Sequence, residues 1–299
     1  MNRGRYRCLV DPGTPGERFV TAMRARELGR KGVVVGDRVA LVGDVSGDPD
    51  TLARIVRVEP RQSALRRTAD DNDPYERIIV ANADQLVIVT ALADPEPRPR
   101  LIDRQLVAAY DAGMDPLLCL TKADLADAGP LVAEYAPLGV PYAVTRRGED
   151  GELRRDDLDE LRRHLAGRTS VLVGHSGVGK STLVNALVPD AERAVSDVNA
   201  VTGRGRHTSS SAIALELPGG GWIIDTPGVR SFGLAHVDPE HVVNAFEDLA
   251  EGAAERCPPH CDHLSEGCGL DGWVADGHAS RARLDSLRRV LASREGEPE

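Results

Sequence analysis

A glycine-rich octapeptide, GHSGVGKS at residues 174–181, has the residue types that bind phosphate. It fits G-x-x-x-x-G-K-[ST] and lies between an apolar segment, TSVLVG, and a helix-forming segment, STLVNAL. Glycines let backbone N–H groups turn toward phosphate oxygens at the positive end of a helix. We predict a loop in which Lys180 reaches the β- and γ-phosphates and the Ser181 hydroxyl ligates Mg²⁺. The predicted nucleotide contacts are Gly174, His175, Ser176, Gly177, Val178, Gly179, Lys180, Ser181 and Thr182.

The tetrapeptide TKAD, residues 121–124, matches [NT]-K-x-D, the segment that recognises guanine in GTP-binding proteins. A carboxylate at its last position accepts both the N1–H and the exocyclic N–H of guanine, which adenine does not offer together. TKAD ends an apolar segment, and ligands bind at the carboxyl ends of strands in open α/β sheets. We predict that Thr121, Lys122 and Asp124 select guanine, with the stem of Lys122 packed along the base.

The segment DTPG, residues 225–228, follows the apolar segment GWII and supplies the pattern D-x-x-G. In this pattern the aspartate, Asp225, reaches Mg²⁺ through a water molecule. The backbone N–H of the glycine, Gly228, bonds the γ-phosphate, so loss of that phosphate releases the following segment. The residue after the glycine is Val229, which cannot orient a water molecule as the glutamine of many GTPases does.

Between the phosphate loop and DTPG lies the polar segment GRGRHTSSS, residues 203–211. A segment that orders around Mg²⁺ needs a hydroxyl ligand, and we choose Thr208 over Ser209. We expect catalysis to involve Lys180, Thr208 and a water-orienting residue. His207 is the first candidate for that residue, His175 is the second, and a solvent-exposed His207 without a catalytic role stays open.

Strand-like and helix-like segments alternate from about residue 80, which predicts a doubly wound, mostly parallel α/β sheet. TKAD precedes the phosphate loop, the reverse of the usual GTPase order. Moving the first part of this region behind the last restores that order with every element accounted for. We therefore predict a circularly permuted P-loop GTPase domain over residues 78–235, with its ends relocated to surface loops.

Three of the five cysteines, Cys257, Cys261 and Cys268, cluster around His263 in the C-terminal region. Three thiolates and one imidazole close a tetrahedral zinc site and leave no open position for a substrate. We predict one structural Zn²⁺ per chain in a helical domain over residues 236–299, and we prefer His263 to His260 as the fourth ligand. Three reduced cysteines without a metal are the alternative.

Residues 1–67 carry 14 Arg and Lys against 8 Asp and Glu, although the chain has a net charge of −10. Short β-like segments broken by Pro, Gly and Asp predict a small all-β barrel or sandwich over residues 1–70. We expect this part to bind an RNA backbone through its arginines, and we expect the Arg-bearing last helix to contact a second RNA surface. No apolar run approaches the length of a membrane span and no signal-peptide pattern is visible, so we expect a cytoplasmic protein.

These motifs together resemble the circularly permuted, ribosome small-subunit-dependent GTPases of the RsgA (YjeQ) family. The resemblance rests on TKAD, GHSGVGKSTLVNAL, GRGRHTSSS, DTPGVRSFGL and the Cys/His cluster, and it covers nearly the whole chain. It implies an N-terminal OB-fold, a permuted GTPase domain and a C-terminal zinc domain. It also implies GTP hydrolysis to GDP and phosphate, stimulated by the small ribosomal subunit and its rRNA, late in subunit assembly. We expect a monomer.

Two positions depart from the family pattern. The ribose-side guanine motif, often Ser-Ala, reads Val144-Thr145 here, and the switch has Thr208 followed by serines rather than consecutive threonines. Two other functions stay open: a nucleotide-gated RNA-binding scaffold in which hydrolysis is incidental, and a small-solute P-loop ATPase, against which TKAD argues.

Overall fold

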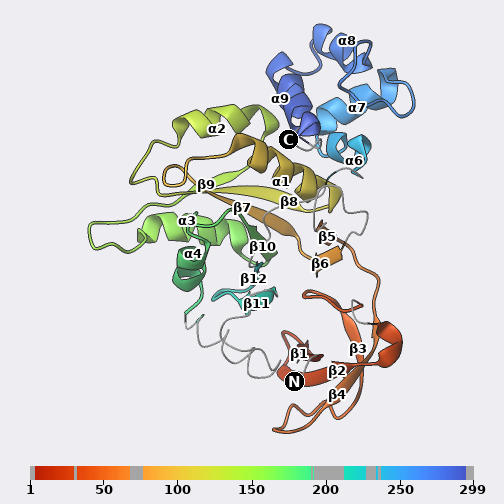
Figure 1. Ribbon diagram of the computed structural model, residues 1–299, viewed down its shortest axis with the longest axis vertical. Helices are drawn as coiled ribbons and strands as arrows, with labels where there is room; N and C mark the ends of the chain where they lie inside the picture. The colour runs from red at the N-terminus through yellow and green to blue at the C-terminus, as the bar shows by residue number, and fades with distance from the viewer. Residues whose placement is uncertain are drawn as a thin grey trace.

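The computed structural model describes residues 4–29, 32–67, 77–189, 191, 212–226, 234 and 237–293. Its elements form an N-terminal group of strands, a central α/β sheet and a C-terminal group of helices (Figure 1). Among the helices of these residues, none has the length and hydropathy needed to cross a bilayer. The predicted fold class, β followed by α/β followed by helical, is confirmed.

The N-terminal strands pair in the order β1-β2-β4-β3, with β2 and β4 parallel and the other pairs antiparallel. A small core, Val20, Ala22, Ala53 and Ile55, fills one face because alternate residues of a strand point to the same side. The elements are β1 (Arg5–Val10), β2 (Arg18–Arg24), the 3₁₀ turn η1 (Arg26–Leu28), β3 (Val39–Gly43) and β4 (Ala53–Val58).

A two-stranded hairpin of β5 (Ala64–Arg67) and β6 (Arg77–Ala81) joins these strands to the central sheet. The sequence did not predict this hairpin, and the mostly apolar run VVVGDRVALVG, residues 33–43, reads in the sequence as one continuous strand. The structure breaks that strand at Gly36, whose φ is 88°. A Cβ there would lie 1.9 Å from the carbonyl oxygen of Ala81, so the two backbones meet directly. Asn82 stabilises this meeting point, which we call the corner at Gly36 and Asn82. Its Nδ2 donates to the Gly36 carbonyl, and its Oδ1 accepts from the N–H of Gln62.

The central sheet has the order β11-β12-β10-β7-β8-β9, and only the edge strand β11 is antiparallel to its neighbour. The mostly parallel sheet is therefore confirmed. Its strands are β7 (Gln85–Ala91), β8 (Asp115–Thr121), β9 (Tyr142–Val144), β10 (Thr169–Val173), β11 (Ile213–Glu216) and β12 (Trp222–Asp225).

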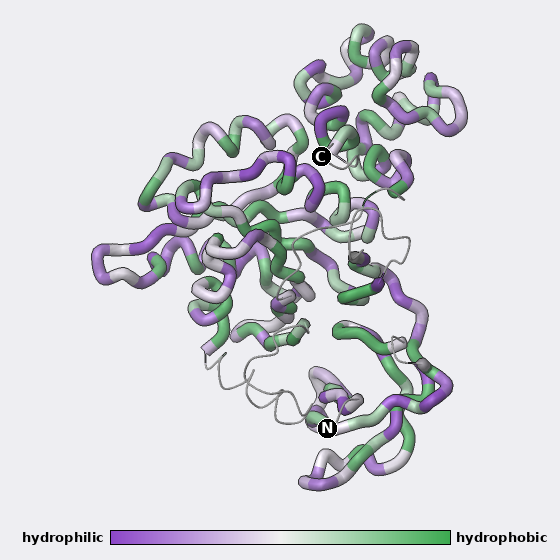
Figure 2. The backbone as a smooth tube through the Cα atoms, viewed as in Figure 1, coloured by the Kyte–Doolittle hydropathy of each residue, from purple (hydrophilic) through white to green (hydrophobic). Residues whose placement is uncertain are grey.

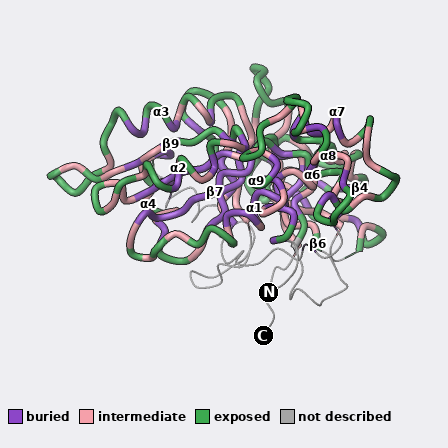
Figure 3. The backbone as a smooth tube through the Cα atoms, turned by 90° about the horizontal axis from the view of Figure 1, so that it is seen from above, coloured by how far each residue is buried: buried purple, intermediate pink, exposed green. Residues whose placement is uncertain are grey.

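Helices cover both faces of this sheet, which explains why its strands read as continuous apolar runs. In β7, Leu86 and Ile88 belong to the core cluster on one face, and Val87 and Val89 belong to the cluster on the other. Figure 2 shows the hydrophobic stretches along these strands, and Figure 3 shows that β7 lies in the buried centre. The first face carries α1 (Pro99–Asp111), α2 (Gly129–Tyr135) and the 3₁₀ turn η2 (Ala136–Leu138), and the second carries α3 (Arg155–Leu165) and α4 (Lys180–Leu187).

The C-terminal helices pack against α1 and share its hydrophobic core. The last helix contributes an apolar stripe to this core, in which Leu284, Leu287, Val290 and Leu291 are all buried. The helices are α6 (Pro239–Val243), α7 (Glu247–Arg256), α8 (Gly269–Ala275) and α9 (Arg281–Ala292).

Two arginines of α9 are held within the chain and do not extend toward a partner. Arg288 donates to the carbonyl of His263 and pairs with Asp271 at 2.8 Å. Arg289 pairs with Asp103 of α1 at 3.2 Å and with Glu134 of α2 at 2.9 Å. Both guanidinium groups therefore have partners within the chain, whereas Arg281 is 62% exposed and pairs with Asp285 on the helix surface. The expected contact of this helix with RNA stays a prediction.

Candidate nucleotide and metal sites

The phosphate loop connects the end of β10 to the start of α4, the strand–loop–helix arrangement that its sequence requires. Gly179 precedes the helix with φ of 95°, a left-handed conformation that favours glycine. Gly174 lies against β7, where a Cβ would come within 2.3 Å of the carbonyl oxygen of Val89. Both glycines are therefore required by the backbone path, and the loop opens at the positive end of α4.

Lys180 begins α4 and folds back over the loop. Its Nζ donates to the carbonyl oxygens of Gly174, at 2.5 Å, and His175, at 2.9 Å. These bonds hold the ammonium group at the mouth of the loop, where an anion would meet it. Ser181 is exposed and Thr182 is half-buried in the first turn of the helix.

Asp225 ends β12 beside β10, so its carboxylate lies on the same edge of the sheet as the phosphate loop. Burial raises the pKa of this carboxyl group above its ordinary value, and the positive charge of Lys180 opposes that rise. The next residue, Thr226, is buried and its hydroxyl donates to the carbonyl of Leu172 at 2.8 Å. This bond fixes the first half of DTPG against β10.

TKAD begins with Thr121, the last residue of β8, which lies two strands from β10 in the sheet. The hydroxyl of Thr121 is buried and donates to the carbonyl of Val178 in the phosphate loop at 2.6 Å. Thr121 thus contributes to the loop's position, a role that the sequence pattern did not reveal. Asp124 is exposed, as a residue that reads a base must be.

Lys122 has φ of 58°, an unusual conformation for a residue with a long side chain. Its ammonium group donates to the carbonyl of Asp94, in the segment after β7. Sequence reasoning did not include this segment in the site. The available signal was positional, because β7 ends between the strands that carry TKAD and the phosphate loop.

The backbone after β9 runs beside TKAD. Thr145 donates its N–H to Leu120 and accepts from the N–H of Ala123, and the N–H of Arg147 reaches Asp124 Oδ1 at 3.0 Å. The Thr145 hydroxyl is buried and has no hydrogen-bond partner among the described residues. The contact to the guanine motif therefore extends beyond Val144-Thr145, the positions singled out from the sequence.

Three predicted residues of the nucleotide site, His207, Thr208 and Gly228, lie outside the described residues. The structure brings together the phosphate loop, TKAD and Asp225 at the carboxyl ends of the parallel strands. This arrangement defines a P-loop nucleotide-binding protein with a guanine-type base motif.

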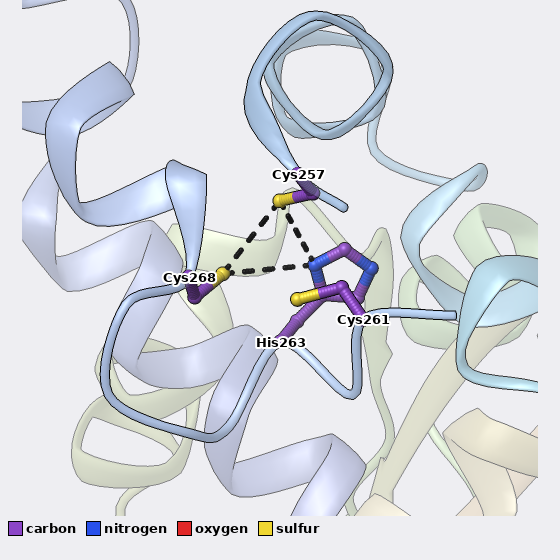
Figure 4. Close-up of side chains that lie close together, drawn as sticks. All are labelled: Cys257, Cys261, His263 and Cys268. Carbon is purple, nitrogen blue, oxygen red and sulfur yellow. Dashed lines mark hydrogen bonds between the residues drawn. The ribbon is translucent and has the colours of Figure 1, made fainter. Parts of the chain in front are cut away.

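The four predicted metal ligands, Cys257, Cys261, His263 and Cys268, also converge, with ligand atoms all within 4.8 Å of one another (Figure 4). Cys257 Sγ lies 3.8 Å from Cys268 Sγ and 3.6 Å from His263 Nδ1. Tetrahedral zinc with Zn–S bonds of about 2.3 Å places two sulfurs about 3.8 Å apart, so the donor set fits such an ion. His260 is exposed and is not part of this cluster.

Electrostatics favour a cation at this cluster. Burial, followed by the neighbouring Cys268, raises the pKa of the Cys257 thiol to about 12, which disfavours thiolates that have no cation beside them. Burial also lowers the pKa of His263, which favours the neutral imidazole that ligates metals. The residues therefore have the chemistry of a closed metal site at the start of α8.

Comparison with known proteins supports this class. A sequence model of the RsgA GTPase family matches residues 58–235. A relative described as small ribosomal subunit biogenesis GTPase RsgA, from Pseudomonas aeruginosa (strain LESB58), is 40% identical over 268 residues, which are 87% of this chain and 76% of the relative. A relative of the same description from Pseudomonas putida is 39% identical over 290 residues, with 95% and 80% covered.

Two solved structures share the fold. The crystal structure of YjeQ from Thermotoga maritima has a TM-score of 0.66 at 24% identity and covers 99% of this chain and 100% of that one. YloQ, described as a circularly permuted GTPase, has a TM-score of 0.65 at 24% identity, with 97% and 91% covered. The chain belongs to the RsgA GTPase family and is a GTP hydrolase.

Proposed function

We propose that this GTPase acts in biogenesis of the small ribosomal subunit, as the name of its relatives describes. The observation that supports GTP as the nucleotide is the bond from Thr121 to Val178, which joins a guanine motif to a phosphate loop despite their reversed order. Asp124 accepts guanine N–H groups, Lys122 packs along the base, and Lys180 binds the β- and γ-phosphates. Ser181 and Thr208, with Asp225 through a water molecule, would hold Mg²⁺, which would neutralise charge at the phosphates.

The water-orienting residue is proposed to be His207, because Val229 follows DTPG where many GTPases have glutamine. Without a glutamine, turnover is slow until a partner orders the switch segment that holds His207 and Thr208. The chain acts as a cytoplasmic monomer that binds GTP, GDP and rRNA of the small subunit. The ion at the Cys/His cluster is a structural Zn²⁺, one per chain.

The N-terminal strands offer a surface for rRNA. The face opposite their small core exposes Phe19, Met23 and Val56, and the guanidinium of Arg7 lies 3.8 Å from the centre of the Phe19 ring. Arg54 is also exposed on β4. Arginines around an aromatic ring suit a nucleic-acid backbone with limited base stacking.

The test is the multiple-turnover GTPase rate of the whole chain with small subunits, with large subunits and with neither. We expect acceleration by small subunits alone. Equal rates in all three conditions would contradict the proposed partner and would favour an RNA-binding scaffold with incidental hydrolysis. His207→Ala should abolish the acceleration, and a wild-type rate in that variant would remove His207 from the mechanism.

Guanine selection has its own test. Asp124→Asn replaces an acceptor with an amide that can donate to the 2-oxo group of xanthine, so the preference should move from GTP toward XTP. A variant that still prefers GTP would show that Asp124 does not read the base.

A further inference from the structure

Asp157, in the first turn of α3, belongs to none of the nucleotide motifs, yet it is tied to the guanine side of the site. Its side chain is only 10% exposed. One oxygen, Oδ2, accepts from the backbone N–H of Arg146 at 3.0 Å and from Nε of the same residue at 2.9 Å. A carboxylate in the first turn is also favoured by the helix dipole. Asp157 therefore anchors the backbone at Arg146.

The loop that starts at this anchor is closed on itself. The carbonyl of Arg146 accepts from the N–H of Arg154 at 3.0 Å, and the N–H of Gly148 donates to Glu152 at 2.8 Å. The side chain of Arg147 crosses the loop to the carbonyl of Gly151 at 2.6 Å. These bonds hold residues 146–154 as one unit at the start of α3.

This unit contacts the base-reading carboxylate. The N–H of Arg147, one residue after the anchored position, donates to Asp124 Oδ1 at 3.0 Å. An ionised carboxylate has about four lone-pair sites, so this bond leaves both oxygens able to accept the two N–H groups of guanine. It also fixes the plane of the carboxylate before the base arrives. Binding then loses less side-chain freedom than it would with a rotating Asp124.

We propose that Asp157 is a positioning residue for guanine recognition: it holds the loop at Arg146 so that the N–H of Arg147 orients the carboxylate of Asp124. The proposal rests on the proposed role of Asp124 in reading guanine. Asp157 itself touches no nucleotide. Its effect should therefore appear in discrimination between bases, more than in binding of phosphate.

The backbone bond and the ion pair can be separated by mutation. Arg146→Ala removes the Nε contact and keeps the backbone N–H on Asp157, whereas Asp157→Ala removes both. The Arg146 side chain is 42% exposed, and half-exposed ion pairs contribute little. Asp157→Asn keeps an acceptor for the backbone N–H and loses only the charge. The matched control is Asp159→Ala, because Asp159 is 66% exposed on the same helix and pairs with Arg162.

The experiment measures dissociation constants of the Mg²⁺-loaded full chain for GDP, IDP and pyrophosphate. IDP lacks the exocyclic amine, so it makes one fewer hydrogen bond to Asp124. We expect Asp157→Ala to weaken GDP binding about tenfold, equivalent to about 1.4 kcal/mol. IDP should weaken less, which lowers the preference for GDP over IDP, and pyrophosphate should bind as in the wild type. Arg146→Ala, Asp157→Asn and Asp159→Ala should stay within about threefold of the wild type for GDP.

Equal weakening of GDP, IDP and pyrophosphate by Asp157→Ala would overturn the proposal, because it would indicate general disruption of the domain. An unchanged GDP affinity would also overturn it. A fall in Arg146→Ala as large as that in Asp157→Ala would assign the effect to the ion pair and reject loop anchoring. Asp124→Asn, measured with GDP and XDP in parallel, separates the base-reading role of Asp124 from the positioning role of Asp157. If Asp124→Asn leaves the base preference unchanged, the role of Asp124 is wrong. If Asp124→Asn changes the preference and Asp157→Ala does not, only the positioning role is wrong.

Discussion

The hydroxyl of Thr121 donates to the carbonyl of Val178 over 2.6 Å, and this bond joins the guanine motif to the phosphate loop. The same oxygen lies 3.3 Å from the carbonyl of Thr90 on the intervening strand β7. A single buried hydroxyl thus connects three neighbouring strand ends. The two halves of the nucleotide site therefore share one hydrogen-bonded support, although the chain visits them in reversed order.

Thr121→Val should weaken nucleotide binding and lower stability. The substitution preserves shape but leaves a buried carbonyl unpaired, which costs about 1–3 kcal/mol. Thr121→Ser keeps the hydroxyl and serves as the control. GDP affinity and the free energy of unfolding measure the effect, and a valine variant that matches the serine variant in both would contradict this role.

Cys268→Ser should lower the bound metal below the proposed one ion per chain and loosen the C-terminal helices, because metal binding contributes to folding free energy. Cys8→Ser is the control, since Cys8 lies in β1, away from the cluster. Elemental analysis after gel filtration gives the stoichiometry, and hydrogen exchange reports on α7 and α8. Full metal content together with unchanged exchange in Cys268→Ser would contradict the site.

Arg289→Met should destabilise the contact between α9 and the GTPase core. Asp103 is buried, accepts from the hydroxyl of Tyr135 at 3.0 Å, and has a pKa raised by burial against the opposing charge of Arg289. Removing the arginine leaves this carboxylate buried without its cation, a change that typically costs about 3–5 kcal/mol.

The control for this pair is Arg281→Met on the exposed side of the same helix, where about 1 kcal/mol or less is expected. Chemical denaturation measures both variants. Adding Asp103→Asn to Arg289→Met should recover much of the loss, and a double variant as unstable as Arg289→Met alone would show that the unpaired charge is not the cause.

His241 of α6 provides a pH-dependent link to α1. Its Nδ1 lies 2.9 Å from Asp111 Oδ1, and this hydrogen bond is the main cause of a pKa raised above the usual value of 6.5. Because the protonated form is favoured in the folded chain, the stabilisation is fully present below pH 6.5. It is lost as pH rises through the raised pKa.

Asp111→Asn should bring the NMR-measured pKa of His241 back toward its usual value. It should also remove the His241-linked pH dependence of the protection factors in α6, which are exchange rates corrected for the intrinsic effect of pH. Asp115→Asn is the control, since Asp115 pairs with Arg168 and not with His241. A His241 pKa that is unchanged in Asp111→Asn would contradict the assigned cause.

The central sheet could be predicted from the sequence because each of its strands is marked by its own apolar run. Each residue of β7 is buried, so the run QLVIVTA could be read as an interior strand without knowledge of its neighbours. The phosphate loop was equally accessible, because its glycines, lysine and serine all lie within the eight residues 174–181. The clustering of the four metal ligands also follows from short spacing along the chain.

Other features depend on contacts between distant segments and left no local signal. The break at Gly36 follows from its approach to Ala81, and the inward turn of Arg289 follows from the position of Asp103. An arginine on a polar helix face looks the same in sequence whether it meets RNA or a buried carboxylate. Asp157 likewise resembles any acidic residue at a helix start until the fold places Arg146 beside it.

The corner at Gly36 and Asn82 has a consequence for any large partner. The contact of Gly36 with Ala81, the bond from Asn82 to Gly36 and the bond from Gln62 to Asn82 hold the segment before β3 against the segment that leads into the central sheet. Because the surfaces of the N-terminal strands and of the central sheet are held relative to each other, binding of a partner to one of them brings the other close to its docking point. The second contact then forms at a high effective concentration. A partner whose two docking points have a different spacing would engage one surface only. The fixed corner therefore selects partners by the spacing between their two docking points.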